Sequence, residues 1–117
     1  MSLTVYGIPT CGTVKKARSW LEQHGIAYEY ADLRLAPPSA ARVAGWIRVV
    51  GVDRLKNLSG GSYRALGPER ERWSEAEWCA AFARDPMLIR RPVIERDGEL
   101  VLVGFKEDAT ELARLGG

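Results

Sequence analysis

The segment from Leu3 to Asp32 reads LTVYGIPTCGTVKKARSWLEQHGIAYEYAD and contains three consecutive patterns. Residues 3–7 form a β-rich run that is closed by the turn formers Gly7 and Pro9, which is typical of a short strand. Apolar residues then recur every three or four positions over about 12–24, which predicts an amphipathic helix. The alternation over residues 26–32 predicts a second strand. We therefore expect strand, helix and strand, with a connection long enough for a parallel crossover.

The rest of the chain predicts helices, a hairpin and a last helix. Residues 39–50 begin with a serine N-cap, and residues 74–85 begin with the Ser-x-x-Glu pattern of a capping box, so both are expected to be helices. Glycine, serine and asparagine between them, over 51–68, indicate a loop with short helical turns. An Asp-Gly turn joins two β-rich runs within 92–103 and predicts a hairpin. A final helix is expected at about 106–115.

This order, β-α-β, then helices, then β-β-α, is that of the thioredoxin-like plan, an α/β fold in which helices flank a small mixed sheet. Because the 117 residues of the chain are fewer than the roughly 150 usual for one domain, we predict a single domain over residues 1–117. Its thioredoxin-like halves are expected at about 1–35 and 86–117, with a helical insertion at about 36–85 between them.

Composition limits the function classes. The chain is 46% hydrophobic with a net charge of +2, which suits a globular domain and does not indicate nucleic-acid binding. No apolar run approaches the roughly 18 residues of a membrane span, so we expect no membrane association and a cytoplasmic location, where thiols are kept reduced. Two cysteines and one histidine cannot form a closed four-ligand zinc site. Neither a metal site nor a bound cofactor is expected.

The turn Ile8-Pro9-Thr10-Cys11-Gly12-Thr13 places a cysteine where the first predicted strand ends and the helix begins. The free N–H groups of a helix's first turn and the positive end of its dipole stabilise an anion, and so favour the reactive thiolate. The same donors can hold an oxyanion or a carboxylate. We therefore predict that Cys11 is a nucleophile. The residues expected to bind its substrate lie around it in the sequence: Thr10, Gly12, Thr13 and Lys15.

Two common cysteine motifs are missing from the sequence. A Cys-x-x-Cys pair needs a second cysteine at Val14, and a Cys-x5-Arg phosphatase loop needs an arginine at Ala17. Cys79 lies beside core residues of a predicted helix and is expected to be buried and inert. His24 is expected to be a partly buried helix-end residue and not a catalytic base. A mixed disulfide at Cys11 then has to be resolved by an external thiol or by Cys79.

A second candidate feature is the sequence Arg90-Arg91-Pro92 before the predicted hairpin. Proline is tolerated at the first residue of a strand, and a cis peptide bond there would fix a turn that could face the helix carrying Cys11. An arginine held in such a turn can donate two hydrogen bonds to an oxyanion or carboxylate. A solvated strand entry explains the same residues, so both interpretations of Arg91 stay open at this point.

Three segments resemble the ArsC/Spx family, above all its YffB-like branch: Leu3–Glu22, then Arg90-Arg91-Pro92-Val93-Ile94, then Leu102-Val103-Gly104-Phe105-Lys106. They occur in the family's order and spacing, and the resemblance covers essentially the whole chain. It implies a thioredoxin-like fold with a helical insertion, a cis peptide bond before Pro92, and Cys11 as the reactive thiol.

The family includes arsenate reductases that use glutathione and glutaredoxin, Spx regulators that bind RNA polymerase, and YffB-like proteins regarded as glutathione-dependent thiol reductases. The arsenate reductases place three arginines around the cysteine. Arg91 matches one, but the other positions fall on or near Ser59 and within 102–104, where the chain has no arginine. Efficient arsenate reduction is therefore not expected. Val14 removes the Cys-x-x-Cys switch of the Spx regulators.

The resemblance and the position of Cys11 together predict a thiol oxidoreductase. Cys11 would attack a small-molecule or protein disulfide, Arg91 would bind a carboxylate or oxyanion, and glutathione would act as co-substrate and resolve the adduct. Glutaredoxin is a further candidate partner. Two alternatives stay open: a glutaredoxin-coupled arsenate reductase, and a non-catalytic regulator that binds RNA polymerase.

Overall fold

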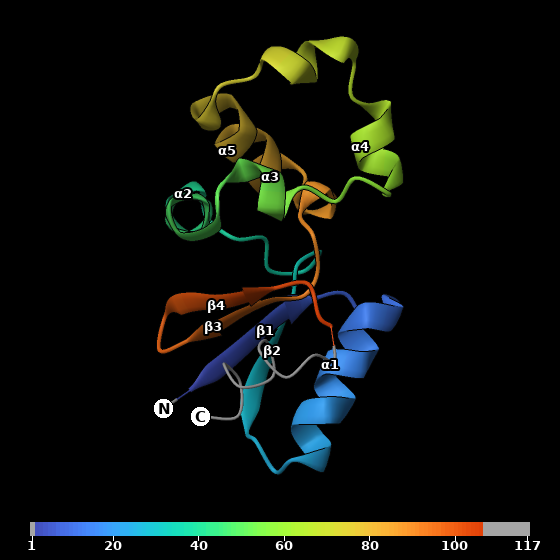
Figure 1. Cartoon of the computed structure of the whole chain (residues 1–117), viewed down its shortest axis with the longest axis vertical. Coiled ribbons are helices and arrows are strands. Elements are labelled where there is room, and N and C mark those ends of the chain that lie inside the picture. The colour runs from blue at the N-terminus through green and yellow to red at the C-terminus, as the bar shows by residue number, and fades with distance from the viewer. Residues whose placement is uncertain (1, 107–117) are drawn as a thin grey trace. The chain divides into compact units, whose positions relative to one another are not determined.

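The computed structural model describes residues 2–106, which form two compact units (Figure 1). The sheet unit contains the described residues up to Leu35 and from Arg91 onward, and the helical unit contains Ala36–Arg90. The helix expected at about 106–115 falls almost wholly outside the described residues. Within residues 2–106 no helix is long and apolar enough to cross a membrane.

The sheet unit is built on four strands in the order β2-β1-β3-β4. β1 pairs in parallel with β2, whereas β3 is antiparallel to both β1 and β4. This mixed sheet, with a helix in its β-α-β crossover, confirms the predicted α/β, thioredoxin-like fold class. The bounds of its strands are β1 Leu3–Gly7, β2 Tyr28–Asp32, β3 Val93–Arg96 and β4 Glu99–Val103.

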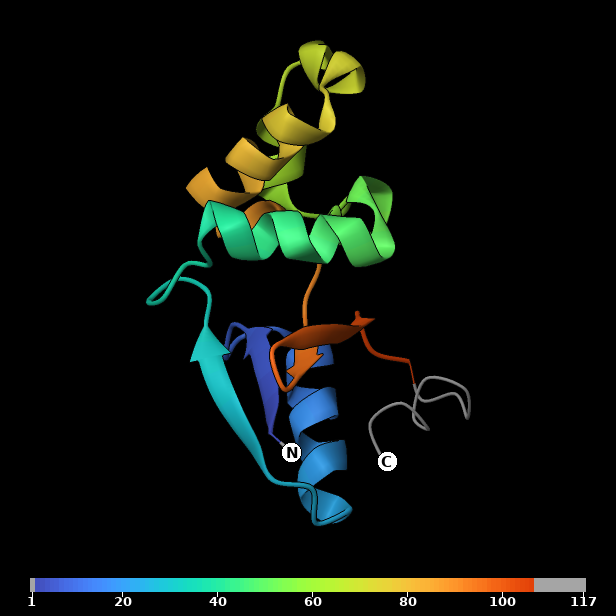
Figure 2. The same cartoon turned by 90° about the vertical axis from the view of Figure 1, so that its left-hand side faces the viewer.

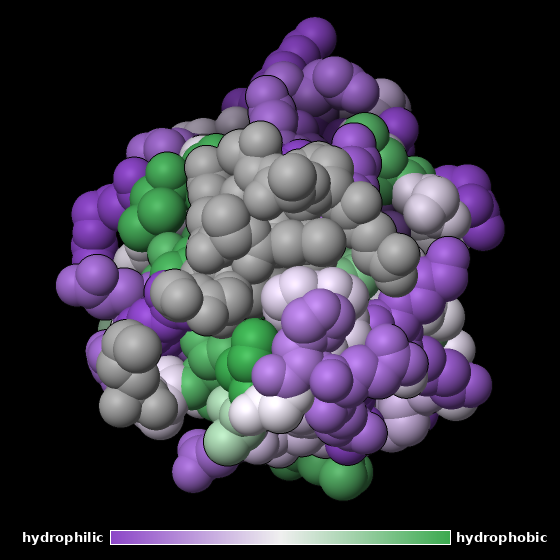
Figure 3. All heavy atoms as spheres, turned by 60° about the horizontal axis from the view of Figure 1, so that its bottom comes forward, coloured by the Kyte–Doolittle hydropathy of each residue, from purple (hydrophilic) through white to green (hydrophobic). Residues whose placement is uncertain are grey.

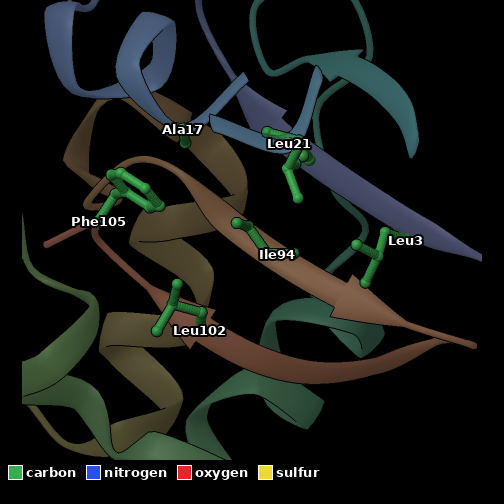
Figure 4. Packing of buried hydrophobic residues seen from close by; sticks show 7 residues of the cluster. Leu3, Ala17, Leu21, Ile94, Leu102 and Phe105 are labelled. Atoms are coloured by element: carbon green, nitrogen blue, oxygen red, sulfur yellow. The ribbon is translucent and has the colours of Figure 1, made fainter. Parts of the chain in front are cut away.

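The helix α1 (Gly12–Gln23) runs alongside β1 and β2 (Figure 2). Its buried residues are those that the sequence periodicity places on one face, and they pack against apolar side chains of the sheet (Figure 4). Gly25 has a positive φ of 66° and directly follows the C-cap of the helix, a position that favours glycine. The buried cluster of this unit consists of Leu3, Val5, Ala17, Leu21, Ile94, Leu102 and Phe105.

The hairpin β3–β4 turns through Asp97 and Gly98, both of which have positive φ. This backbone matches the two-residue turn that the Asp-Gly sequence predicts.

On the face of the molecule shown in Figure 3, hydrophilic residues cover most of the visible described surface and apolar residues form small separate groups. The apolar side chains of this unit are therefore used mainly in packing helix against sheet.

The helical unit contains the helices expected from their caps. The Ser39 side chain accepts a hydrogen bond from the Arg42 N–H at 3.1 Å, and Ser74 forms the predicted capping box with Glu77. α2 contacts α5, and their buried faces include Trp46. The elements of the unit are α2 Ala40–Val50, α3 Val52–Leu55, α4 Gly61–Ala65, η1 Pro68–Arg72, α5 Glu75–Arg84 and η2 Pro86–Leu88.

The last residues of the helical unit form backbone hydrogen bonds with an earlier segment of the same unit. Lys56 forms an isolated antiparallel bridge with Ile89, and the Arg90 N–H donates to the Leu55 carbonyl at 2.7 Å. These hydrogen bonds attach the segment after η2 to this unit. The chain enters the sheet unit at Arg91.

The end of β1 lies against the first turn of α1 without room for a side chain. A Cβ added at Gly7 would lie 2.7 and 2.8 Å from the two Cγ atoms of Val14, which is fully buried. The Gly7 carbonyl also accepts a hydrogen bond from the Leu33 N–H at 2.9 Å. Glycine is therefore needed at position 7 because the strand and the helix approach each other there.

We predict that Gly7→Ala lowers the free energy of unfolding by about 1–3 kcal/mol, because the added methyl group overpacks the contact with Val14. Gly12→Ala is the matched control, since a Cβ at Gly12 meets nothing within 4 Å, and its stability should stay within about 0.5 kcal/mol of the parent. Urea denaturation of both variants measures the difference. Equal midpoints would show that Val14 moves aside freely.

Candidate active site

Cys11 is the N-cap of α1, with an extended backbone of φ −80° and ψ 122°. Its carbonyl accepts a hydrogen bond from the Lys15 N–H at 3.0 Å, and its own N–H donates to the Ile8 carbonyl at 3.2 Å. The thiol is free and half-buried, and it forms no capping hydrogen bond with the helix. A reactive group in this position is accessible and lies beside the N–H donors of a helix's first turn.

The four predicted substrate-binding residues lie on the same turn as Cys11. Thr10, Gly12 and Lys15 are exposed, and Thr13 is half-buried. Because a Cβ at Gly12 would meet nothing within 4 Å, the protein itself does not require glycine there. The missing side chain leaves the backbone N–H groups of the turn open to an incoming molecule.

Arg91 and Pro92 lie at the edge of the sheet from which the Cys11 turn leaves. β3 runs antiparallel to β1 and Val93 pairs with Tyr6, so the residues before β3 lie beside the end of β1. The peptide bond between Arg91 and Pro92 is cis, and the Pro92 carbonyl accepts a hydrogen bond from the Gly104 N–H at 2.8 Å. The half-buried Arg91 therefore belongs to the segment beside the end of β1, from which the Cys11 turn leaves.

Asp32 ends β2 at this same edge, where it pairs with Gly7 of β1. Its carboxylate accepts hydrogen bonds from the Arg34 guanidinium at 3.1 Å and from the Arg34 N–H at 2.9 Å. These hydrogen bonds lower the pKa of Asp32. The negative charge of Asp32 is therefore paired with a cation, which reduces its repulsion of an anion bound at the turn.

A cluster of one arginine and two tyrosines covers the β2 side of α1. Arg18 Nε donates to the Tyr28 hydroxyl at 2.9 Å, and that hydroxyl donates to the Glu22 carboxylate. The Arg18 guanidinium also lies 4.0 Å from the centre of the Tyr30 ring. The alternation in the sequence places both tyrosines on one side of a strand, but it does not indicate Arg18 as their partner. The cluster is therefore visible only in the folded chain.

The prediction that Cys79 is buried was wrong. Cys79 is half-buried, and its thiol donates to the Ala40 carbonyl at 3.3 Å. It lines a hollow of about 420 Å³ between α2 and α5. The buried residues of α5 are Trp78, Ala81 and Phe82, and a residue directly after Trp78 is rotated about 100° away from it, so Cys79 lies at the margin of that stripe.

The prediction that His24 is partly buried was also wrong. His24 is exposed and stacks on the Trp20 ring with a centroid distance of 4.0 Å, and its Nδ1 lies 2.8 Å from the Trp20 carbonyl. It is the C-cap, one residue beyond the last turn of α1. The side chain therefore packs on the end of the helix and does not reach the core.

A model of the ArsC family matches residues 6–112, a stretch that includes the Cys11 turn and the Arg91–Pro92 segment. The chain belongs to the ArsC family. The YffB-like branch is supported by a solved structure described as a YFFB (PA3664) protein, which is 34% identical, with a TM-score of 0.87 and coverage of 97% of this chain and 98% of that one.

Other proteins that resemble this chain carry different descriptions. A possible arsenate reductase from Streptococcus mutans is 32% identical, with a TM-score of 0.85 and coverage of 95% and 97% of the two chains. The uncharacterized protein YusI of Bacillus subtilis is 43% identical, with 95% and 97% covered. The global transcriptional regulator Spx of Listeria innocua is 28% identical, with 91% and 82% covered. The relatives thus include both arsenate reductase-like proteins and regulators.

We predict that iodoacetamide alkylates Cys11 at pH 7 about five times faster than Cys79, or more. The reason is that the N–H donors and the dipole at a helix N-terminus favour negative charge on the N-cap by about 1 kcal/mol, a factor of about five, whereas Cys79 lies in the middle of a helix and donates to a carbonyl. Mass spectrometry of the alkylated peptides over time measures both rates, and Cys11→Ser and Cys79→Ser isolate each thiol. Faster reaction at Cys79 would contradict the prediction.

Proposed function

We propose that the protein is a glutathione-dependent thiol oxidoreductase. The Cys11 thiolate attacks one sulfur of a disulfide, a bond forms between that sulfur and Cys11, and the other sulfur leaves as a thiolate. A glutathione thiolate then attacks the substrate sulfur of the mixed disulfide and forms a disulfide with it, while the bond to Cys11 breaks and Cys11 leaves as a thiolate. The observation that carries this proposal is the half-buried, free Cys11 thiol at the N-terminus of α1.

The residues around Cys11 supply the contacts that such a reaction needs. Backbone N–H groups at Gly12 and Thr13 hold the anionic part of the substrate, assisted by the Thr10 hydroxyl and the Lys15 ammonium group. Arg91 binds a carboxylate of glutathione or of the substrate, since a guanidinium group can donate two parallel hydrogen bonds to it. Each of these groups is positive or donates hydrogen bonds, which suits an anionic thiol compound.

The requirement for an external thiol follows from the two cysteines of the chain. The residue three positions after Cys11 is Val14, which is fully buried and contacts Gly7. Cys79 belongs to the helical unit, where its thiol is engaged with Ala40. Glutathione supplies the second thiol, and glutaredoxin is a candidate partner for the reduction of the mixed disulfide.

The proposal predicts one glutathione per chain after treatment with oxidised glutathione, attached at Cys11. Reduced glutathione, alone or with glutaredoxin, should remove it. Intact-mass and peptide mass spectrometry measure both steps. Cys11→Ser should take up none at that site, and the control Cys79→Ser should behave as the parent. An internal disulfide between Cys11 and Cys79 would replace this mechanism with one that needs no external thiol.

Arsenate reduction is the second candidate, favoured by the similarity to a possible arsenate reductase. The resemblance to the arsenate reductases puts one missing arginine on or near Ser59. In the structure, Arg64 donates to the Ser59 carbonyl at 2.7 Å, and the Ser59 hydroxyl donates to Asn57 Oδ1 at 3.3 Å. A cation thus lies next to this position, but it is bound to the backbone of the loop.

We predict slow arsenate turnover by the parent protein in a glutaredoxin-coupled assay and a rise of about tenfold in Ser59→Arg, because a cationic donor stabilises the oxyanion. Ser59→Lys is a control for charge without bidentate geometry. Fast turnover by the parent would refute the argument from missing arginines.

The Spx relatives provide the third candidate, a regulator that binds RNA polymerase. This function would not require the Cys11 thiol. Capture of purified polymerase by both the parent and Cys11→Ser would favour it over both enzymes, whereas no capture by either would count against it.

A further inference from the structure

The hydroxyl group of Tyr30 is buried and has no hydrogen-bond partner among the described residues. Burial of an unpaired hydroxyl is unfavourable, so such a group calls for a physical explanation. The neighbouring Tyr28 on the same strand shows the contrast, since its hydroxyl interacts with both Arg18 and Glu22. Tyr30 contacts Arg18 only through its ring, which leaves its hydroxyl available for another acceptor.

The register of the strands and the direction of α1 place Tyr30 between Tyr28 and the Cys11 end of the helix. β2 is parallel to β1, and Tyr30 pairs with Val5, two residues before the end of β1. Tyr28 contacts Arg18 and Glu22. Two residues along a strand advance about 6.6 Å, which equals about four residues of a helix. Because α1 runs back along the strands (Figure 2), Tyr30 lies about one turn closer to the Cys11 end than Tyr28.

The charges around Tyr30 keep its hydroxyl protonated. Burial raises the pKa of Tyr30, the carboxylate of Asp32 raises it further, and so does the negative charge of the Cys11 thiolate. The opposing cations are Arg18, from α1, and Arg34, which follows β2. A protonated phenol beside a sulfur that becomes anionic can act as a hydrogen-bond donor.

We propose that the Tyr30 hydroxyl donates a hydrogen bond to Cys11 Sγ when that sulfur carries negative charge. Tyr30 is a positioning residue for the proposed thiol chemistry, and this inference rests on the proposed function. When a glutathione thiolate attacks the mixed disulfide, the bond to Cys11 breaks and its electron pair stays on Cys11 Sγ. The phenol stabilises this leaving thiolate without transferring its proton, and so complements the helix N–H groups.

Tyr30→Phe tests the inference, with Tyr28→Phe as the matched control. Tyr30→Phe keeps the ring that Arg18 contacts and removes only a hydroxyl that lacks a partner in the described structure, so the variant should fold. Tyr28→Phe removes a hydroxyl from the same strand and the same arginine contact. Thermal unfolding of both variants separates a loss of stability from a change at the thiol.

The decisive measurement is the rate of Cys11 alkylation by iodoacetamide as a function of pH, in the Cys79→Ser background. We expect the pH of half-maximal rate to rise by at least about half a pH unit in Tyr30→Phe, because a hydrogen bond to the thiolate is lost. Tyr28→Phe should superimpose on the parent. Release of Cys11 from its glutathione adduct by reduced glutathione should also slow, by about threefold or more.

The outcomes separate this inference from the proposed function. If the Tyr30→Phe and parent profiles coincide while the parent still forms and releases a glutathione adduct at Cys11, the inference is wrong and the proposed function stands. If the parent forms no adduct but Tyr30→Phe still shifts the alkylation profile, the hydrogen bond is supported and glutathione dependence is wrong. An equal shift in Tyr28→Phe would refute a specific role for Tyr30.

Discussion

The contact between Gly7 and Val14 is the constraint on which the site depends. It brings the first turn of α1 against the end of β1 with no space for a side chain at position 7. The buried cluster of α1 and the sheet holds the rest of the helix in the same orientation (Figure 4). The turn that carries Cys11 therefore connects a strand and a helix that are packed against each other. This arrangement presents the thiol to the N–H donors of the helix.

The sheet topology gathers the charged and polar groups of the site at one edge. β1 and β2 end there together because they are parallel, and β3 begins there because it is antiparallel to β1. Cys11, Asp32 and Arg91 are far apart in the sequence, but Asp32 ends β2, Cys11 follows β1 after a short turn, and Arg91 lies shortly before β3. Tyr30 lies on β2 and its ring contacts Arg18 of α1, and in our proposal its phenol adds a donor from the sheet to those of the helix.

The two cysteines have different surroundings, and this difference supports a mechanism with one working thiol. Cys11 is a helix N-cap in the sheet unit, whereas Cys79 is a mid-helix residue whose thiol donates to Ala40 in the helical unit. Membership of the ArsC family is consistent with thiol chemistry. An external thiol such as glutathione completes the proposed cycle.

The sequence by itself determined the features that depend on neighbours in the chain: the strand ending at Gly7, the caps at Ser39 and Ser74, the hairpin turn, and Cys11 at a helix start. Local periodicity and capping chemistry decide these. Only the tertiary structure decided that Cys79 and His24 are accessible, that Gly7 meets Val14, and that the Tyr30 hydroxyl is buried without a partner. Exposure and unpaired groups depend on which surfaces pack together, and residues distant in the sequence supply those surfaces.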